Sequence, residues 1–225
     1  MAKQNKQAQA QANVSEAVSR TEAYIEKNKK KLSTTIVVII VLIAAVWLAN
    51  NYWLQPRQQK ALAALSAGEQ YFQKGEFKTA LNGDTYDYEG FEAIIKKFNG
   101  TKAANLAKAY AGLSLAQTGN TEEAVKYLKA FKGKDTMIAP SVLAALGNCL
   151  AQNGDVATAA ATLEKAAAKA DNNLLSPAYL VQAGQLYEQL GNNAKALKVY
   201  QKVKDVYYRS NQAADIDKYI EKVSK

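Results

Sequence analysis

Few residues of this chain could perform chemistry. Asp84, Asp87 and Glu89 lie within six positions of one another, and carboxylates so close together could bind calcium. Their spacing does not match the ligand spacing of an EF-hand, so we interpret this stretch as a solvated insert. Cys149 is the only cysteine, and the chain has no histidine to activate it. We therefore predict that Cys149 is a small buried hydrophobic residue and not a nucleophile.

The composition narrows the function classes further. Without histidine the chain lacks the commonest general base and the commonest metal ligand, and a single cysteine permits neither an intrachain disulfide nor a CxxC pair. No glycine-rich phosphate loop or catalytic constellation is present. The net charge of +9 comes from mixed charges and not from a concentrated basic stripe, which argues against nucleic-acid binding. We predict no enzyme activity, no cofactor, no metal and no nucleic-acid partner.

The elements that would position a binding surface begin with an apolar segment. Residues 36–49 are 14 uninterrupted apolar residues, and their flanks extend the segment to the 23 residues 32–54. As a helix this segment is about 34 Å long, enough to cross a hydrocarbon layer of about 30 Å. Trp47, Tyr52 and Trp53 would form an aromatic belt at its C-terminal end. The sequence therefore predicts that residues 32–54 span a lipid bilayer.

The flanks of this segment bear on its processing and orientation. A cleaved signal peptide is the alternative, but the preceding tail is long, and cleavage after Ala49 would place Trp47 where a small side chain is required. Five Lys or Arg lie in the 15 residues before the span and two in the 15 after it. The positive-inside rule then puts the basic tail, residues 1–31, in the cytoplasm. We predict an uncleaved signal anchor in a bacterial inner membrane, with residues 55–225 in the periplasm.

The remaining chain repeats itself. Three stretches align without gaps: GLSLAQTGNTEEAVKYL from Gly112, GNCLAQNGDVATAAATL from Gly147 and GQLYEQLGNNAKALKVY from Gly184. The spacings of their first glycines are 35 and 37 residues, and an earlier copy, GEQYFQKGEFKTA, begins at Gly68. This pattern is typical of the tetratricopeptide repeat, a helical hairpin with a period of about 34 residues. We predict an all-α fold: one N-terminal transmembrane helix, then a tetratricopeptide-repeat superhelix of about four repeats plus a capping helix.

The repeated small residues have physical reasons. The first glycine of each copy would let the two helices of a repeat approach closely. A second glycine seven residues later would end the first helix in a left-handed conformation. In the first copy, Asn82, Gly83 and Gly90 interrupt the second helix before FEAIIKKF resumes an amphipathic pattern. We expect the insert within residues 82–105 to reshape one end of the superhelix.

Helical phase predicts which residues face the inside of the superhelix. At 100° per residue, the positions three before, one after, and four or five after the first glycine lie opposite the packed face. In a superhelix that flank lines the concave surface, where repeat proteins bind their partners. The predicted concave residues are Leu65, Glu69, Phe72, Gln73, Ala109, Leu113, Ala116, Gln117, Ala144, Asn148, Ala151, Gln152, Val181, Gln185, Glu188 and Gln189.

The chemistry of this set suits an extended peptide. Asn and Gln both donate and accept hydrogen bonds, and Leu65, Phe72 and Leu113 offer an apolar end. The alternative is that these are ordinary exposed helix residues, because Gln and Ala favour helices anyway. The set contains no Lys or Arg, which argues against a clamp for the carboxylates of chaperone tails and against a cytosolic import receptor.

The chain as a whole resembles the YfgM-like family of bacterial tetratricopeptide proteins. The basic tail, the single span with its aromatic exit, and the stretches YFQKGEFKTA, FEAIIKKF and GLSLAQTGNTEEAVKYL carry the resemblance from about Leu32 onward. The ALNGD insert is similar to that of Bacteroidetes-type members. The resemblance implies an ancillary subunit of the SecYEG translocon. It also implies a membrane-anchored periplasmic chaperone of the prolyl-isomerase type as a partner, and secretory client proteins that leave the channel.

Two functions remain open at this point. The first is an adaptor at the periplasmic side of the SecYEG translocon that binds translocon partners, a periplasmic chaperone or emerging client proteins. The second is a structural scaffold for envelope or outer-membrane assembly complexes that binds no clients. Crosslinking from the concave surface distinguishes them, because nascent secretory chains would be trapped only under the first.

Overall fold

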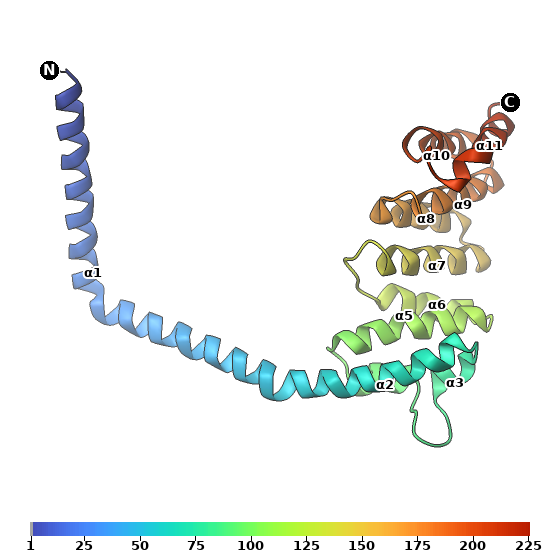
Figure 1. Cartoon of the computed structure of the whole chain (residues 1–225), viewed down its shortest axis with the longest axis horizontal. Coiled ribbons are helices and arrows are strands. Elements are labelled where there is room, and N and C mark those ends of the chain that lie inside the picture. The colour runs from blue at the N-terminus through green and yellow to red at the C-terminus, as the bar shows by residue number, and fades with distance from the viewer. Residues whose placement is uncertain (1) are drawn as a thin grey trace. The chain divides into compact units, whose positions relative to one another are not determined.

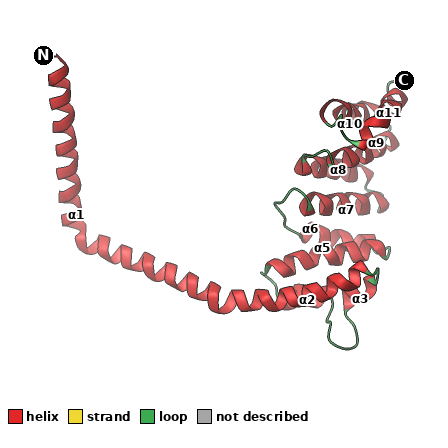
Figure 2. Ribbon diagram, viewed as in Figure 1, coloured by secondary structure: helices red, strands yellow, loops and turns green. Residues whose placement is uncertain are grey.

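The computed structural model describes residues 2–225, with their side chains from residue 25 onward (Figure 1). This described part of the chain is helical, and Figure 2 shows no strand in it. It divides into two compact units, Met1–Pro56 and Arg57–Lys225. The all-α prediction is confirmed. The charged side chains predicted for the basic tail before residue 25 lie outside the described residues.

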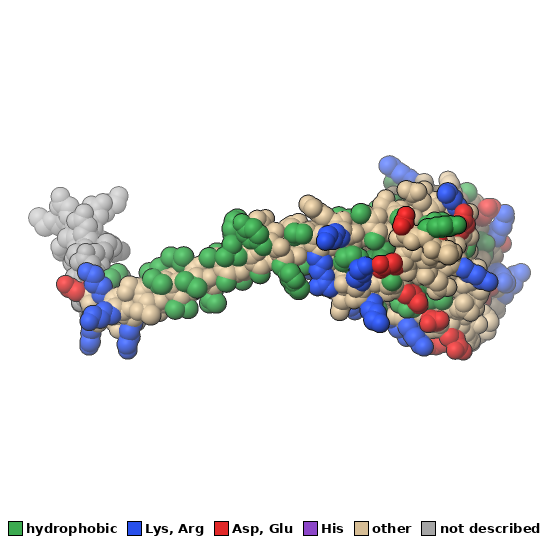
Figure 3. Space-filling model, turned by 90° about the horizontal axis from the view of Figure 1, so that it is seen from below, with side chains coloured by type: hydrophobic (Ala, Val, Ile, Leu, Met, Phe, Trp, Pro, Cys, Tyr) green, Lys and Arg blue, Asp and Glu red, His purple; other side chains and the backbone are tan. Residues whose placement is uncertain are grey.

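The first unit is built on one long helix. α1 spans Ala2–Ala49, and the chain continues through a π-helical turn, η1 (Asn50–Leu54), into α2 (Gln55–Gln73). The side chains of residues 36–49 are exposed all round, and Figure 3 shows them beside a lysine-rich end. By length and composition, this is the one helix among the described residues that could cross a membrane. The helix continues past residue 54 to Gln73, so the limits of the span, residues 32–54, stay a prediction.

The π-helical turn has a cause in the sequence. Pro56 has no backbone N–H, and its ring crowds the carbonyl of Tyr52 one turn earlier. The N–H of Gln55 donates to the carbonyl of Asn50, five residues back. A wider turn of this kind inserts one extra residue, so the helix passes the proline without ending.

Hydroxyl side chains stand at the lysine-rich end of the apolar run. Ser33 and Thr34 donate to the carbonyl of Lys30 at 2.9 and 2.8 Å. Thr35 donates to the carbonyl of Lys31 at 2.9 Å. These bonds return each hydroxyl to the backbone of its own helix, which lowers the cost of placing it at the edge of a hydrocarbon layer.

The second unit is a stack of helical hairpins. Three of them are complete: α5 (Lys102–Gln117) with α6 (Thr121–Ala130), α7 (Ile138–Gln152) with α8 (Val156–Ala170), and α9 (Ser176–Gln189) with α10 (Asn193–Val206). Figure 1 shows these helices stacked in chain order. A short 3-10 helix, η2 (Asn211–Asp215), and α11 (Ile216–Val223) follow α10, where the capping helix was predicted.

Small residues hold each hairpin together. A Cβ on Gly112 would lie 2.6 Å from Cγ of Leu128, and a Cβ on Gly184 would lie 2.2 Å from the ring of Tyr200. Both distances are shorter than any van der Waals contact, so glycine permits this close approach. The second glycine of each copy has a positive φ, for example 84° at Gly119. Both roles predicted for the repeated glycines are confirmed.

The stack buries two adjoining hydrophobic clusters. The first includes Phe91 and Leu115, and the second includes Leu163, all with exposed fractions of 2% or less. Leu143 and Leu186 pack against both clusters, so the apolar interior continues along the stack. Each hairpin alone would leave an apolar stripe open, so its stability depends on its neighbours.

The first hairpin is interrupted, as predicted. After α2, helix α3 (Phe77–Asn82) ends at Gly83, and α4 (Phe91–Lys97) begins after Gly90. Both glycines have a positive φ, 96° and 91°, which lets the chain leave and rejoin the hairpin sharply. Figure 1 shows the connection between α3 and α4 as a long loop.

The insert differs in one respect from the solvated excursion that we expected. Tyr88 is only 5% exposed: its hydroxyl donates to the carbonyl of Ala80 at 2.7 Å, and its ring stacks on that of Tyr71 at 5.3 Å. Tyr86, two residues earlier, is 91% exposed. One face of the insert is therefore part of the core, and its tip is solvated.

Asp84 shapes this insert. Its Oδ1 accepts hydrogen bonds from the N–H groups of Tyr86, Asp87 and Tyr88 at 2.9, 3.0 and 3.0 Å. Its Oδ2 accepts the hydroxyl of Tyr71 at 2.5 Å. The hydrogen bond from Tyr71, followed by the backbone donors, lowers the pKa of Asp84 to about 2. Within the described residues, no group of three or more His, Cys, Asp or Glu could hold a metal ion.

The lowered pKa of Asp84 predicts a pH-dependent stability. The charged form is favoured in the folded state, so its contribution is present above the unfolded pKa of 3.8 and is lost as the pH falls through about 2. We expect Asp84→Asn to melt at a lower temperature than the unmodified chain at pH 7. The difference should shrink between pH 4 and pH 2. Asp87→Asn removes a neighbouring charge and serves as the control, and an unchanged difference at pH 2 would contradict the role of Asp84.

Candidate protein-interaction groove

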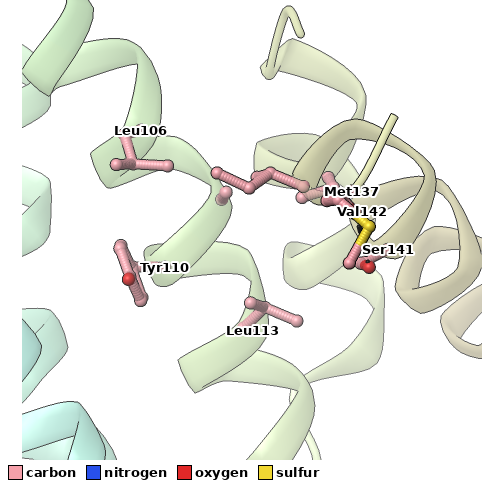
Figure 4. A pocket seen from close by; sticks show the side chains of 8 residues that line it. Leu106, Tyr110, Leu113, Met137, Ser141 and Val142 are labelled. Atoms are coloured by element: carbon pink, nitrogen blue, oxygen red, sulfur yellow. Dashed lines mark hydrogen bonds between the residues drawn. The ribbon is translucent and has the colours of Figure 1, made fainter. Parts of the chain in front are cut away.

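The first helices of the second and third repeats, α5 and α7, enclose an apolar hollow. Its volume is about 340 Å³, and we call it the groove pocket. Figure 4 shows Leu106, Tyr110 and Leu113 of α5 on one side and the residues at the start of α7 on the other. The complete lining is Leu106, Ala109, Tyr110, Leu113, Met137, Ile138, Ser141 and Val142.

The groove pocket is open to solvent at the start of α7. Met137 is 50% exposed and Ile138 is 49% exposed, although both side chains are apolar. Asp135 fixes this turn, because its Oδ1 accepts the N–H groups of Met137 at 3.0 Å, of Ile138, and of Ala139 at 3.1 Å. Exposed apolar side chains on an ordered turn favour contact with another molecule.

Aromatic rings support the α5 side of the groove pocket. The ring of Tyr110 packs edge-on against Phe72 at 5.2 Å and stacks on Phe91 at 5.3 Å. Burial raises the pKa of Tyr110 to about 12, and the carboxylate of Glu69 adds to the shift. A phenol is neutral at physiological pH even with its ordinary pKa, and this shift keeps it neutral at higher pH as well, so this wall of the pocket carries no charge on its tyrosine.

The structure distributes the predicted concave residues over three environments. Leu65 and Ala109 are buried, with exposed fractions of 2% and 3%, although Ala109 lines the groove pocket. Leu113 also lines that pocket. Ala144 is buried as well, with an exposed fraction of 5%. The half-buried residues are Glu69, Phe72, Leu113, Ala116, Ala151, Val181 and Glu188, and the exposed ones are Gln73, Gln117, Asn148, Gln152, Gln185 and Gln189.

Two predicted residues have other partners. Glu188 forms an ion pair with Lys222 of α11 at 2.6 Å and accepts the hydroxyl of Tyr200 at 2.5 Å, so it fastens the capping helix. Gln152 lines a polar hollow together with Asn153 and residues 119–123, away from the groove pocket. The structure brings together only Ala109 and Leu113 of the predicted set in the groove pocket.

Sequence reasoning missed most of the pocket. Leu106 lies six residues before Gly112, beyond the positions that the phase argument counted. Met137 and Ile138 lie at the helix start, where the phase relative to Gly147 is least informative. The available signal was two consecutive large apolar residues directly after the polar run KGKDT, at positions where a helix should begin with polar residues.

Cys149 occupies the core as predicted. It is 2% exposed and belongs to the first hydrophobic cluster. Burial raises the pKa of its thiol, so the nucleophilic thiolate is disfavoured. The structure therefore gives this cysteine a packing role.

Comparison with known proteins agrees with this geometry. Residues 177–208, which cover most of α9 and all of α10, match the family model Tetratricopeptide repeat. The second unit has the tetratricopeptide-repeat fold. A search of curated proteins finds no match. Tetratricopeptide repeats imply a protein–protein interaction scaffold, a class of fold that is typically not catalytic.

The solved structures that this chain is similar to are distant from it in sequence. The crystal structure of nearly identical TPR-like repeats, described as a kinesin light chain of Podosopora anserina, is 13% identical, with a TM-score of 0.56. The alignment covers 74% of this chain and 86% of that chain. A variant of the same protein gives a TM-score of 0.54 at 13% identity, covering 74% and 85%. The crystal structure of MamA protein is 18% identical over 72% of this chain and 89% of that chain, with a TM-score of 0.49.

Proposed function

We propose that this protein is a membrane-anchored tetratricopeptide adaptor at the periplasmic side of the SecYEG translocon. Its repeat unit would bind translocon partners, a membrane-anchored periplasmic chaperone or emerging secretory clients. The observation that carries the proposal is the groove pocket: an open apolar hollow of about 340 Å³ on a protein-interaction fold. The resemblance to the YfgM-like family supplies the translocon as the partner.

The anchor contributes to this function by concentration. The helix from Ile25 to Gln73 is long and apolar enough to hold the chain in a membrane. The excess of Lys and Arg before the span favours a cytoplasmic N-terminus and a periplasmic repeat unit. A tethered site meets a nearby client at a high effective concentration, so weak contacts through one apolar pocket suffice and release remains fast.

Site-specific photocrosslinking in intact cells tests the proposal. We expect a photoreactive residue at Ile138, in the groove pocket, and one at Gln185 to trap stalled secretory chains, a periplasmic chaperone or SecY. Lys198 on α10 is exposed and lies outside the groove pocket, so it serves as the control position. Protease added to spheroplasts should also reach the repeat unit.

The outcomes separate the proposal from its alternative. Crosslinks from Ile138 to envelope-assembly proteins, with no nascent secretory chain, would favour the scaffold function. Equal crosslinking from Ile138 and Lys198 would show that the groove pocket is not the contact surface. Protection of the repeat unit from external protease would contradict the proposed topology.

A further inference from the structure

A second apolar hollow lies where α6, α7 and α8 meet. Its volume is about 400 Å³, and we call it the edge pocket. Leu128 and Phe131 form its wall on the α6 side, and Val142 and Leu143 form its wall on α7. Val142 also lines the groove pocket, so α7 separates the two hollows. The other lining residues differ, and the edge pocket is therefore a separate site.

The edge pocket differs from the groove pocket in charge. Lys132 and Lys134 of the α6–α7 loop and Lys169 of α8 line it together with the apolar side chains. The ion pairs found in the described part of the chain all join other residues. Within the residues that the structure describes, none of the three ammonium groups around this apolar hollow forms an ion pair with a carboxylate. An incoming negative charge would gain from all three.

The loop that carries two of these lysines is held in place. The side-chain amide of Asn105 makes two hydrogen bonds to the backbone of Lys132. Its Nδ2 donates to the carbonyl of Lys132 at 2.7 Å, and its Oδ1 accepts the N–H of Lys132 at 3.0 Å. A Cβ on Gly133 would lie 2.7 Å from both Cβ of Ala139 and the ring of Phe131, so the loop packs tightly on its neighbours. Binding would therefore cost little ordering of the backbone.

The one carboxylate of this loop is already engaged. Asp135 accepts three backbone N–H groups at the start of α7 and does not line the edge pocket. It forms no ion pair with a lysine in the described part of the chain. Lys169 of α8 is half-buried and lines the pocket. A lysine in such a place typically covers apolar surface with its methylene stem and keeps its ammonium in water.

We propose that the edge pocket is a docking site for a protein segment in which apolar side chains are flanked by carboxylates. The hollow would take one or two apolar side chains, and Lys132, Lys134 and Lys169 would pair with acidic residues on either side of them. A concave pocket requires a protruding side chain, which a peptide supplies more readily than a flat anionic membrane. This site does not depend on the translocon assignment, because none of the three lysines lines the groove pocket.

Peptide titration of the full chain tests this proposal. The chain is held in phosphatidylcholine nanodiscs and titrated with a fluorescein-labelled peptide in which leucine and phenylalanine are flanked by glutamates. Two matched peptides replace either the apolar residues by serine or the glutamates by lysine. We expect only the first peptide to bind, and to bind more weakly as salt is raised, because exposed charge pairs are screened.

Charge reversal at the site supplies the decisive comparison. Lys132→Glu, Lys134→Glu and Lys169→Glu together should weaken binding of the acidic apolar peptide at least about tenfold. The control reverses the same number of charges at Lys78, Lys198 and Lys202, which are exposed and line neither pocket. This control should bind the acidic apolar peptide with an affinity within about threefold of that of the unmodified chain.

Three results would overturn the proposal. The first is equal weakening in the two triple variants, which would mean a non-specific charge effect. The second is binding of the serine peptide as tight as that of the acidic apolar peptide, which would mean that the hollow takes no apolar side chain. The third is a pair of results: phosphatidylglycerol vesicles displace the peptide, and the control variant with Lys78, Lys198 and Lys202 reversed binds these vesicles as well as the unmodified chain does. This pair would identify a lipid surface as the occupant.

Discussion

Replacing Tyr88 by alanine is expected to destabilise the first hairpin by about 3–5 kcal/mol, the loss typical of a buried aromatic side chain. The ring of Tyr88 stacks on Tyr71 at 5.3 Å and meets Phe91 edge-on at 6.2 Å. Its hydroxyl donates a hydrogen bond to the carbonyl of Ala80. In the variant this buried carbonyl would lose that donor. A Cβ on Gly68 would lie 2.1 Å from that hydroxyl, so α2 rests directly on this side chain.

Amide hydrogen exchange followed by mass spectrometry locates the loss. In the Tyr88→Ala variant, α3 and α4 should exchange faster while α9 and α10 keep their protection, because repeats couple mainly to their neighbours. Tyr88→Phe keeps the ring and should lose only about 1 kcal/mol.

Tyr86→Ala is the matched control in the same insert. Tyr86 is 91% exposed, so we expect its replacement to change stability by less than about 0.5 kcal/mol. Similar exchange in the Tyr86→Ala and Tyr88→Ala variants would show that the insert is not packed into the first hairpin.

The repeat architecture could be predicted from the sequence because its signals are local and recur. A glycine in the first helix and the residue sixteen positions later meet across each of the three complete hairpins, as Gly112 meets Leu128 and Gly147 meets Leu163. This contact depends only on helix geometry and on a short turn, and both are encoded within one period. The interruption by Gly83 and Gly90 could be predicted for the same reason.

The inward face of the insert could not be predicted in this way. Tyr88 belongs to neither helical nor strand periodicity, so nothing in its neighbourhood distinguishes it from Tyr86. Its burial follows from the hydrogen bonds that Asp84 makes to the turn and from the space left beside Gly68. The hydrogen bonds of Asp84 join residues two and four positions apart, but the contact between Gly68 and Tyr88 joins residues 20 positions apart across an irregular loop.

Both pockets depend on packing between repeats. The groove pocket joins Leu106 of one repeat to Ile138 of the next, and the edge pocket adds Lys169 from α8 to the α6–α7 loop. Phase within a single helix selects one face of that helix, and on α5 this face includes Ala109 and Leu113. It does not show which exposed side chains of two successive repeats enclose a hollow, because that depends on the rotation between repeats.

Among the first glycines of the three complete hairpins, Gly112, Gly147 and Gly184, replacing Gly184 by alanine is expected to have the largest effect, a loss of about 3 kcal/mol or more. A Cβ at this position would lie 2.2 and 2.5 Å from Cε1 and Cζ of Tyr200. Tyr200 is fully buried, its hydroxyl donates to Glu188 at 2.5 Å, and its ring packs on Tyr219 at 5.3 Å. The rigid ring cannot turn aside, so α9 and α10 would have to separate.

Gly147→Ala provides the matched comparison, because the nearest side-chain atom to its Cβ is Cγ of Leu163 at 2.9 Å. A leucine can change rotamer, and we expect a loss of about 1 kcal/mol, measured by urea unfolding at constant detergent concentration.

Tyr200 is the counterpart of Leu163 in the fourth repeat. The double variant Gly184→Ala, Tyr200→Leu should therefore be less destabilised than the sum of its single variants by about 1–3 kcal/mol. Strict additivity would mean that the close approach of α9 and α10 is not limited by this ring, and that the last repeat tolerates a wider hairpin than its glycine indicates.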